Sequence, residues 1–345
     1  MNQAHPSPIL IAFGYRRLEF KPIGERTGIY AEPSVVDKAV YEFADMEKML
    51  IAAEELYGPY LWEQYDVIVL PASFPFGGME NPRLTFATPT ILAGDRSLTA
   101  LIAHELAHSW SGNLVTNATW DDFWLNEGFT VYFERRIMEA LYGEEYVKML
   151  TQLGIQDLQN TIEDLGASSE DTHLKLSLQN RNPDDGMTDI AYEKGCLFLM
   201  AMEEQVGRER FDQFLKKYFS DHKFQTLTTE EFITYLNKEL IEPEKMNIDL
   251  NAWIYAPGIP DDHPVITSNK FELVETYLEN HIGNSDWNKS GTDQWSTHEW
   301  LHFIRALPTD LDLDKARKID NVFGFSKSGN SEIIAAWLET SIGNG

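Results

Sequence analysis

The chain has 345 residues, of which 43% are hydrophobic, enough to bury a sizeable core and to form two domains rather than one. Its 28 Lys and Arg residues against 55 Asp and Glu residues give a formal net charge of -27. Because this charge repels phosphate backbones and anionic lipid headgroups, we expect neither nucleic acid nor a membrane as a partner.

The beginning of the chain shows no targeting signal. Residues 1–8 lack the basic and apolar segments of a signal peptide, and no run approaches the ~18 apolar residues that a membrane helix needs. Cys196 is the single cysteine, so an intrachain disulfide is impossible, and its apolar neighbours predict a buried structural thiol. These features favour a reducing, cytoplasmic location.

Two short extended segments are predicted in the first quarter of the chain. Residues 65–70 are rich in β-branched side chains and end at Pro71, and a second extended piece covers residues 84–88. The connecting loop contains Gly77 and Gly78, whose backbones tolerate close approach by another chain. We therefore expect this loop to line a cleft.

Helical periodicity begins at Ser97, which is predicted to cap a helix whose apolar residues recur at spacings of three and four. A second helix is expected over residues 126–141, ending at Gly143, and a third from about Thr188 to Gly207. Amphipathic helices follow over 210–219 and 229–240. Strands early and helices late predict an α+β fold.

The last part of the chain is predicted to be a separate set of helices. The turn-rich segment 255–260 is the best candidate for a linker. Beyond it, the segments 296–307, 313–322 and 331–342 resemble short paired helices, although no sequence period identifies a named repeat.

The string His104-Glu105-Leu106-Ala107-His108 lies inside the helix predicted from Ser97. Residues four apart share a helix face, with Cβ atoms ~6 Å apart, so both imidazoles reach one zinc ion at roughly 2.0–2.1 Å. Glu105 is placed to face a zinc-bound water rather than to bind the metal. On this string alone, two hydrogen-bonded core histidines remain an alternative.

Glu127 supplies the second half of the predicted site. Eighteen residues separate it from His108, and it begins the second predicted helix. Two histidines and one carboxylate leave the fourth position of zinc to water, as catalytic sites do. A structural site would usually need a fourth protein ligand, for which Cys196 is the only cysteine. One catalytic Zn²⁺ per chain is the preferred interpretation.

This residue set suits peptide hydrolysis. Zinc lowers the pKa of its water toward ~7, and Glu105 would accept the proton and later pass it to the leaving amine. Tyr192 is a candidate donor to the tetrahedral oxyanion. The alternative for Tyr192 is a packing residue near a helix start.

Together these motifs resemble the one-zinc gluzincin aminopeptidases, peptidase family M1, and within it the leukotriene A(4) hydrolase branch. The match covers most of residues 20–260 and continues more weakly into the tail. It is carried by segments 77–81, 81–86, 104–108, 110–116, 123–128 and 192–195. The resemblance implies a thermolysin-like catalytic domain at 21–257, after an unmatched leader at 1–20. A linker at 258–264 and a partial α-helical domain of paired helices at 265–345 would follow.

The resemblance also implies roles for individual residues. Glu80 would bind the free amino terminus of the substrate. Gly77, Gly78 and Met79 belong to the same substrate-binding loop, where the glycine backbones would contact the peptide. Tyr192 would be the transition-state tyrosine. Asp184 would assist peptide hydrolysis, and its alternative is a solvated turn.

Three departures from the family pattern qualify these expectations. Only about twenty residues precede the match, so the β-rich amino-terminal domain, with a glutamine that helps to hold the amine, is expected to be absent. The Arg and Lys that grip a tripeptide carboxylate would lie beyond Gly345. Met187 stands where the epoxide-hydrolysing member has a second tyrosine. We expect a homo-oligomer, or segment 8–13, to cover the surface that the missing domain would expose.

The sequence thus predicts a zinc aminopeptidase that removes the amino-terminal residue of short peptides. Two alternatives remain open. One is a hydrolase with altered or broadened specificity, acting on esters or longer peptides. The other is a zinc-binding scaffold with low turnover.

Overall fold

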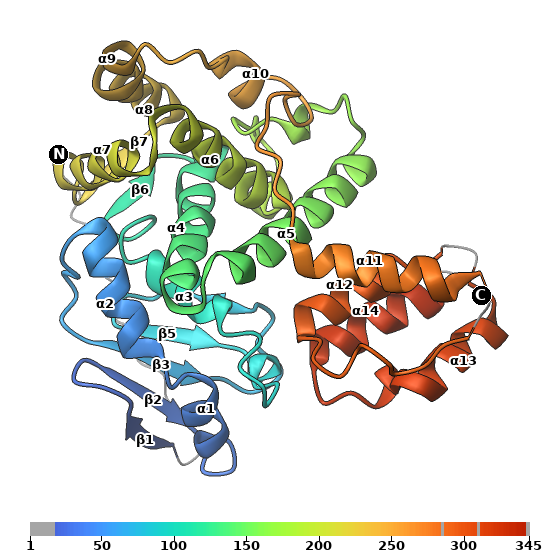
Figure 1. The fold of residues 1–345 in the computed structure, drawn as a ribbon. Coiled ribbons are helices and arrows are strands. Elements are labelled where there is room, and N and C mark those ends of the chain that lie inside the picture. Colours follow the sequence, from blue (N-terminus) through green and yellow to red (C-terminus); the bar gives the residue numbers. More distant parts are fainter. Residues whose placement is uncertain (1–17, 284–285, 309–310, 343–345) are drawn as a thin grey trace.

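The computed structural model describes residues 18–283, 286–308 and 311–342 (Figure 1). Its main sheet is mixed, with the strand order β1-β2-β3-β5-β4. The strands are β1 (Glu19–Pro22), β2 (Thr27–Ala31), β3 (Tyr65–Val69), β4 (Gly78–Met79) and β5 (Leu84–Ala87). The central strands β2, β3 and β5 are parallel, whereas the edge strands β1 and β4 are antiparallel to their neighbours.

The parallel pair β2–β3 requires a crossover, and two helices provide it. These are α1 (Val36–Glu42) and α2 (Met46–Tyr57). All five residues of β3 are buried, which indicates that both faces of the sheet centre are covered. The sheet therefore holds its edge strand β4 on a rigid support.

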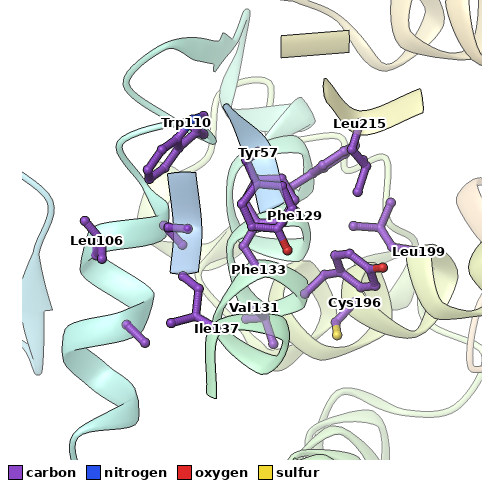
Figure 2. Close-up of a cluster of buried hydrophobic side chains, with 14 of the residues drawn as sticks. Tyr57, Leu106, Trp110, Phe129, Val131, Phe133, Ile137, Cys196, Leu199 and Leu215 are labelled. Carbon is purple, nitrogen blue, oxygen red and sulfur yellow. The ribbon is translucent and has the colours of Figure 1, made fainter. Parts of the chain in front are cut away.

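The long helix α4 (Trp124–Tyr142) lies at the centre of the molecule and packs against α2 and α3 (Ala100–Ala107). Every residue from Trp124 to Met138 is buried, as expected for a helix surrounded by other elements. Figure 2 shows its apolar side chains meeting those of neighbouring helices. The labelled members of this core are Tyr57, Leu106, Trp110, Phe129, Val131, Phe133, Ile137, Cys196, Leu199 and Leu215.

Further helices complete this part of the chain. They are α5 (Glu144–Leu165), α6 (Gly195–Val206), α7 (Arg208–Asp221), α8 (Thr229–Leu236), α9 (Glu242–Glu244) and α10 (Leu250–Ile254). A small parallel sheet pairs β6 (Val115–Asn117) with β7 (Gln225–Leu227). A π-helical turn, η5 (Ile190–Lys194), leads directly into α6.

Four helices at the end of the chain pack around a second hydrophobic cluster. They are α11 (Asn269–Ile282), α12 (Thr297–Arg305), α13 (Leu313–Phe323) and α14 (Ser331–Ile342), drawn in orange and red at one side of Figure 1. Met149 and Leu153 of α5 belong to this second cluster, whereas Leu158 and Ile162 belong to the main core. Helix α5 therefore contributes to both cores.

The α+β fold class is confirmed, and the strands predicted at 65–70 and 84–88 correspond to β3 and β5. One detail was wrong. Ser97 does not cap α3, because the helix starts at Ala100 with Thr99 at its amino-terminal boundary. Ser97 Oγ instead accepts a hydrogen bond from Asn330 of the C-terminal helices. A tertiary contact has replaced the local one.

The order of strands before helices also needs correction, since α1 and α2 lie between β2 and β3. Helix α5 was not predicted, because its 22 residues are largely polar and interrupted by Gly154. Its helical form depends on burial of apolar residues in both cores, a tertiary effect.

Cys196 is buried with a free thiol, as predicted. Within the described ranges, no helix has the length and apolar character that crossing a bilayer requires. The leader 1–20 and its segment 8–13 lie almost wholly outside the described residues. The domain boundaries, the homo-oligomer and the cytoplasmic location stay predictions.

Candidate active site

The structure brings the three predicted zinc ligands together. His104 and His108 lie one turn apart at the end of α3, and Glu127 lies in the first turn of α4, which packs against α3. The two Nε2 atoms are 3.2 Å apart, and Oε2 of Glu127 is 3.4 Å from each of them. The three ligand atoms therefore form a nearly equilateral triangle.

Hydrogen bonds to the opposite ring nitrogens orient both imidazoles. Nδ1 of His108 lies 2.9 Å from the carbonyl oxygen of Ser111, which only accepts, so Nδ1 donates. Nδ1 of His104 lies 3.2 Å from Oε2 of Glu134, whose pKa is lowered, against the effect of burial, by Arg135 and His104. In a neutral ring, each Nε2 is then left with its lone pair directed at the triangle.

This arrangement fits a zinc ion. Bonds of about 2.0–2.1 Å to a tetrahedral zinc would separate ligand atoms by about 3.3–3.4 Å, which matches the triangle. Oε2 of Glu127 is buried and has no hydrogen-bond partner among the described residues. Two lone pairs and a carboxylate oxygen this close together repel one another unless a metal ion or a proton lies between them. Against the effect of burial, nearby carboxylates including Glu127 raise the pKa of both imidazoles, so protons take that place when no metal is bound.

Glu105 lies between the two histidines in sequence and is buried. Its Oε2 also has no hydrogen-bond partner in the described structure. Burial raises the pKa of this carboxyl to about 7, a value that suits a group that takes up and returns a proton near neutral pH. A Cβ on Gly78 of β4 would lie 2.1 Å from Oε1 of Glu105, so glycine is required for this close approach.

Tyr192 reaches the site from η5. Gly128, which follows Glu127, meets Gly195 so closely that a Cβ on either would lie 2.7 Å from the Cα of the other. This contact holds the start of α6, directly after η5, against α4, and the Tyr192 ring is stacked on the His104 ring with centroids 6.1 Å apart. Burial, followed by the charges of Glu127 and other carboxylates, raises the pKa of Tyr192, so its hydroxyl remains a donor.

The loop that is predicted to bind substrate lies across the same site. Ligand atoms of Glu80, Glu105 and His108 lie within 4.8 Å of one another. The backbone carbonyl of Glu80 accepts a 2.8 Å hydrogen bond from Asn113, which holds the loop in place. Gly77, Gly78 and Met79 line the same cavity, of about 790 Å³, with the zinc-ligand triangle.

Two predicted positions differ in their relation to this cavity. Met187 lines it and is 40% exposed. Asp184 is exposed in the short helix η4 (Pro183–Gly186) and is absent from the described residues that line the cavity. Its role stays a prediction, and this placement favours the alternative of a solvated turn.

A buried chain of charges behind His104 was not anticipated. Glu134 contacts His104 and forms an ion pair with Arg135, and Arg135 continues at 2.9 Å to Glu193, the residue after Tyr192. One feature of the sequence indicates the position of Glu134. Glu134 follows Glu127 by seven positions, which places both on one face of α4.

Comparison with known proteins agrees with this geometry. The model of the Peptidase family M1 domain matches residues 41–253. Leukotriene A-4 hydrolase of Xenopus laevis is 39% identical, in an alignment that covers 96% of this chain and 56% of that protein. Leucine aminopeptidase 2-1 of Meyerozyma guilliermondii is 38% identical, with 97% and 58% covered. The chain thus spans just over half the length of these relatives.

Solved structures show the same likeness. Yeast LTA4 hydrolase in complex with bestatin has a TM-score of 0.86 and 33% identity, covering 95% of this chain and 57% of that one. An M1 zinc metallopeptidase from Deinococcus radiodurans, at 24% identity and a TM-score of 0.55, shares the fold. Because the family model spans more than half of the chain, the chain belongs to peptidase family M1, the family of these zinc metallopeptidases.

Proposed function

We propose that this chain is a zinc aminopeptidase that removes the amino-terminal residue of short peptides. The observation that carries the proposal is the carboxylate of Glu80 beside Glu105 and His108, within 4.8 Å. A carboxylate at that distance pairs with the ammonium group of a peptide whose first carbonyl lies at the zinc site. This register restricts cleavage to the first peptide bond.

In this proposal, His104, His108 and Glu127 hold zinc, which when bound polarises the scissile carbonyl and acidifies a water molecule. Glu105 accepts the proton of the attacking water and delivers it to the leaving amine. Tyr192, whose hydroxyl stays protonated, donates a hydrogen bond to the developing oxyanion. The backbone of Gly77 and Gly78, next to Glu105, aligns the peptide as an added strand on the edge of the sheet.

Hydrolysis of an aminoacyl fluorogenic amide, of its N-acetylated form and of the corresponding ester tests the proposal. An aminopeptidase cleaves the free amide at least about tenfold faster than the acetylated one. Similar rates on both would support broadened specificity instead, and zinc binding without turnover on any of them would support a scaffold. Among these functions, the position of Glu80 favours the first.

Glu80→Ala is expected to lower the ratio of kcat/KM for free over acetylated substrate by about 10²-fold. The physical reason is the loss of a charge-assisted pair, which is worth about 1.5–3 kcal/mol. Steady-state kinetics on the two amides give this ratio. Glu63→Ala, in an exposed ion pair with Arg83, is the matched control and should leave the ratio unchanged. A ratio unaltered by Glu80→Ala would show that the amine is held elsewhere.

Gly78→Ala is expected to lower kcat/KM by about 10²-fold, because its Cβ would force the Glu105 carboxylate or the edge strand to move by about 1 Å. Gly77→Ala is the neighbouring control, since its Cβ would lie 3.2 Å from a flexible Leu101 side chain and should cost less than about threefold. Kinetics on one aminoacyl amide compare the two variants. Equal losses would show that the loop as a whole, and not its contact with Glu105, matters.

A further inference from the structure

Two side chains that the proposed reaction uses together come from different elements. His104 belongs to α3 and Tyr192 to η5, and their rings are stacked with centroids 6.1 Å apart and 17° between the ring planes. Aromatic pairs occur over a range of centroid distances, about 4.5–7 Å, so the stack alone does not fix one ring relative to the other. A directional connection between the two elements is needed for that.

Three charged side chains provide such a connection. Oε2 of Glu134 lies 3.2 Å from Nδ1 of His104, and the other oxygen of Glu134 pairs with Nη1 of Arg135. Nη2 of Arg135 donates a 2.9 Å hydrogen bond to Glu193, which directly follows Tyr192 in the chain. Together with the ring stack, these contacts form a closed circuit that returns to His104. We call the side chains of Glu134, Arg135 and Glu193 the charged bridge.

The elements around the charged bridge leave it little room to move. Arg135 is 7% exposed on α4, and η5 packs against both α4 and α5. The carboxylate of Glu193 lies against α5 at Gly154, where a Cβ would overlap it. Just before η5, Asp189 accepts a 2.6 Å hydrogen bond from Thr161 of α5. The position of η5 is therefore fixed from two sides.

The charged bridge suits a positioning role better than a purely stabilising one. Removing charges from water costs free energy that their mutual attraction often only balances, so buried ion pairs contribute little net stability. Charge-assisted hydrogen bonds are nevertheless short and specific in direction. The guanidinium of Arg135 presents its donors in a rigid planar fork, so the two carboxylates that it joins are held at one separation.

We propose that Arg135 is a positioning residue that aligns the zinc ligand His104 with the oxyanion donor Tyr192. Glu134 carries the alignment to the imidazole, and Glu193 carries it to the backbone of Tyr192. Without the guanidinium, two buried carboxylates would lie near each other with no cation between them, so at least one would move. This inference rests on the proposed aminopeptidase function and adds a residue that acts on both the metal site and the oxyanion donor.

Arg135→Met tests the part of the charged bridge that ends at His104. Methionine keeps a long apolar stem and removes both ion pairs. We expect zinc affinity, measured by competition with a chromophoric chelator and without substrate, to fall about 10–100-fold, as when other groups that orient metal-bound histidines are lost.

Arg136→Met is the matched control, because Arg136 is also 7% exposed on α4 but pairs with Asp212, and neither residue lines the cavity. Its zinc affinity should stay within about twofold of that of the unmodified chain. Unchanged zinc affinity in Arg135→Met, or an equal fall in both variants, would overturn the assignment.

Steady-state kinetics at saturating zinc test the part that ends at Tyr192. We expect Arg135→Met to lower kcat by about tenfold and to change KM by less than about threefold, because a displaced oxyanion donor acts only in the transition state. In a Tyr192→Phe background, the same substitution should lower kcat by less than about threefold, since the hydroxyl that it aligns is gone. An equal loss of kcat in both backgrounds would contradict the proposal.

The kinetics also distinguish positioning from direct contact with substrate. Arg135 lines the cavity, and its Nε has no hydrogen-bond partner among the described residues. A higher KM with unchanged kcat in Arg135→Met would therefore show that the guanidinium binds the substrate itself, and would overturn the positioning role.

Glu193→Gln keeps the shape of the side chain, so it tests the charged bridge even if Arg135→Met fails to fold. It weakens the contact with Arg135 and leaves the pair with Glu134 in place. We expect kcat to fall about threefold, with zinc affinity within about twofold. Glu203→Gln, which weakens a 2.7 Å ion pair with Arg208, should change neither. Lower zinc affinity with unchanged kcat in Glu193→Gln would contradict the proposal.

Binding measurements separate this inference from the proposed function. If the chain hydrolyses neither amides nor esters, the aminopeptidase proposal fails, and zinc affinity still decides the first part of the charged bridge. A phosphinic analogue of leucyl-alanine decides the second, because it has an anionic tetrahedral centre in place of the scissile carbonyl. Calorimetry should show about tenfold weaker binding in Arg135→Met and Tyr192→Phe, and no change in Arg136→Met. Equal affinity in all three variants would exclude the alignment of Tyr192.

Discussion

Glu105→Gln should retain zinc and lose hydrolysis by about 10²–10⁴-fold, the usual worth of general acid–base catalysis. Its carboxylate is buried beside His104 and His108, and burial raises its pKa to about 7, so it exchanges a proton near neutral pH. The amide has nearly the same shape and fits under Gly78, but it does not accept a proton. Steady-state kinetics and elemental analysis of zinc measure the two properties separately.

Glu42→Gln provides the control for replacing a buried carboxylate by an amide. Glu42 is 2% exposed and accepts hydrogen bonds from the backbone of Gly94 and Arg96, and it is not among the residues that line the cavity. We expect lower thermal stability but unchanged kcat/KM. If Glu105→Gln turned over at the rate of the unmodified chain, Glu105 would not be the base.

Local sequence signals were sufficient to predict the zinc-ligand triangle. The spacing of His104 and His108 places both imidazole rings on one face of a helix, and this depends only on local helix geometry. Glu127 was assigned from its place at the start of a second predicted helix, and the packing of that helix against α3 brings its carboxylate to the two imidazoles. Strands β3 and β5 were likewise predicted as two extended segments on either side of the glycine loop, whereas their parallel pairing is a finding of the structure.

The part of the cavity that α12 lines could not be predicted from sequence, because it depends on contacts between distant segments. His298 approaches Arg135 only because α12 packs on α5, and 163 positions separate these two residues in the chain. The polar surface of α5 gives no local sign that one helix serves two hydrophobic cores. The start of α3 was misplaced for the same reason, since Ser97 bonds to Asn330 rather than to its own helix.

Removal of zinc by a strong chelator is expected to abolish hydrolysis, and stoichiometric zinc should restore it. Nε2 of both histidines and Oε2 of Glu127 face one another at 3.2–3.4 Å, so one zinc ion contacts all three atoms in the folded chain but not in the unfolded one. Zinc at 100 times its dissociation constant would stabilise the fold by about 2.7 kcal/mol. The metal-free chain should therefore unfold several degrees lower, as calorimetry would measure.

His108→Ala should reproduce both effects without a chelator, by removing one of three ligands and the hydrogen bond to Ser111. His222→Ala tests for a general effect of losing an imidazole, because His222 packs on Tyr218 and Tyr235, away from the cavity lining. It should retain one zinc per chain and full hydrolysis. Undiminished hydrolysis by a sample shown to be metal-free would exclude the zinc mechanism, since Glu105 alone does not lower the pKa of water from about 15.7 toward 7.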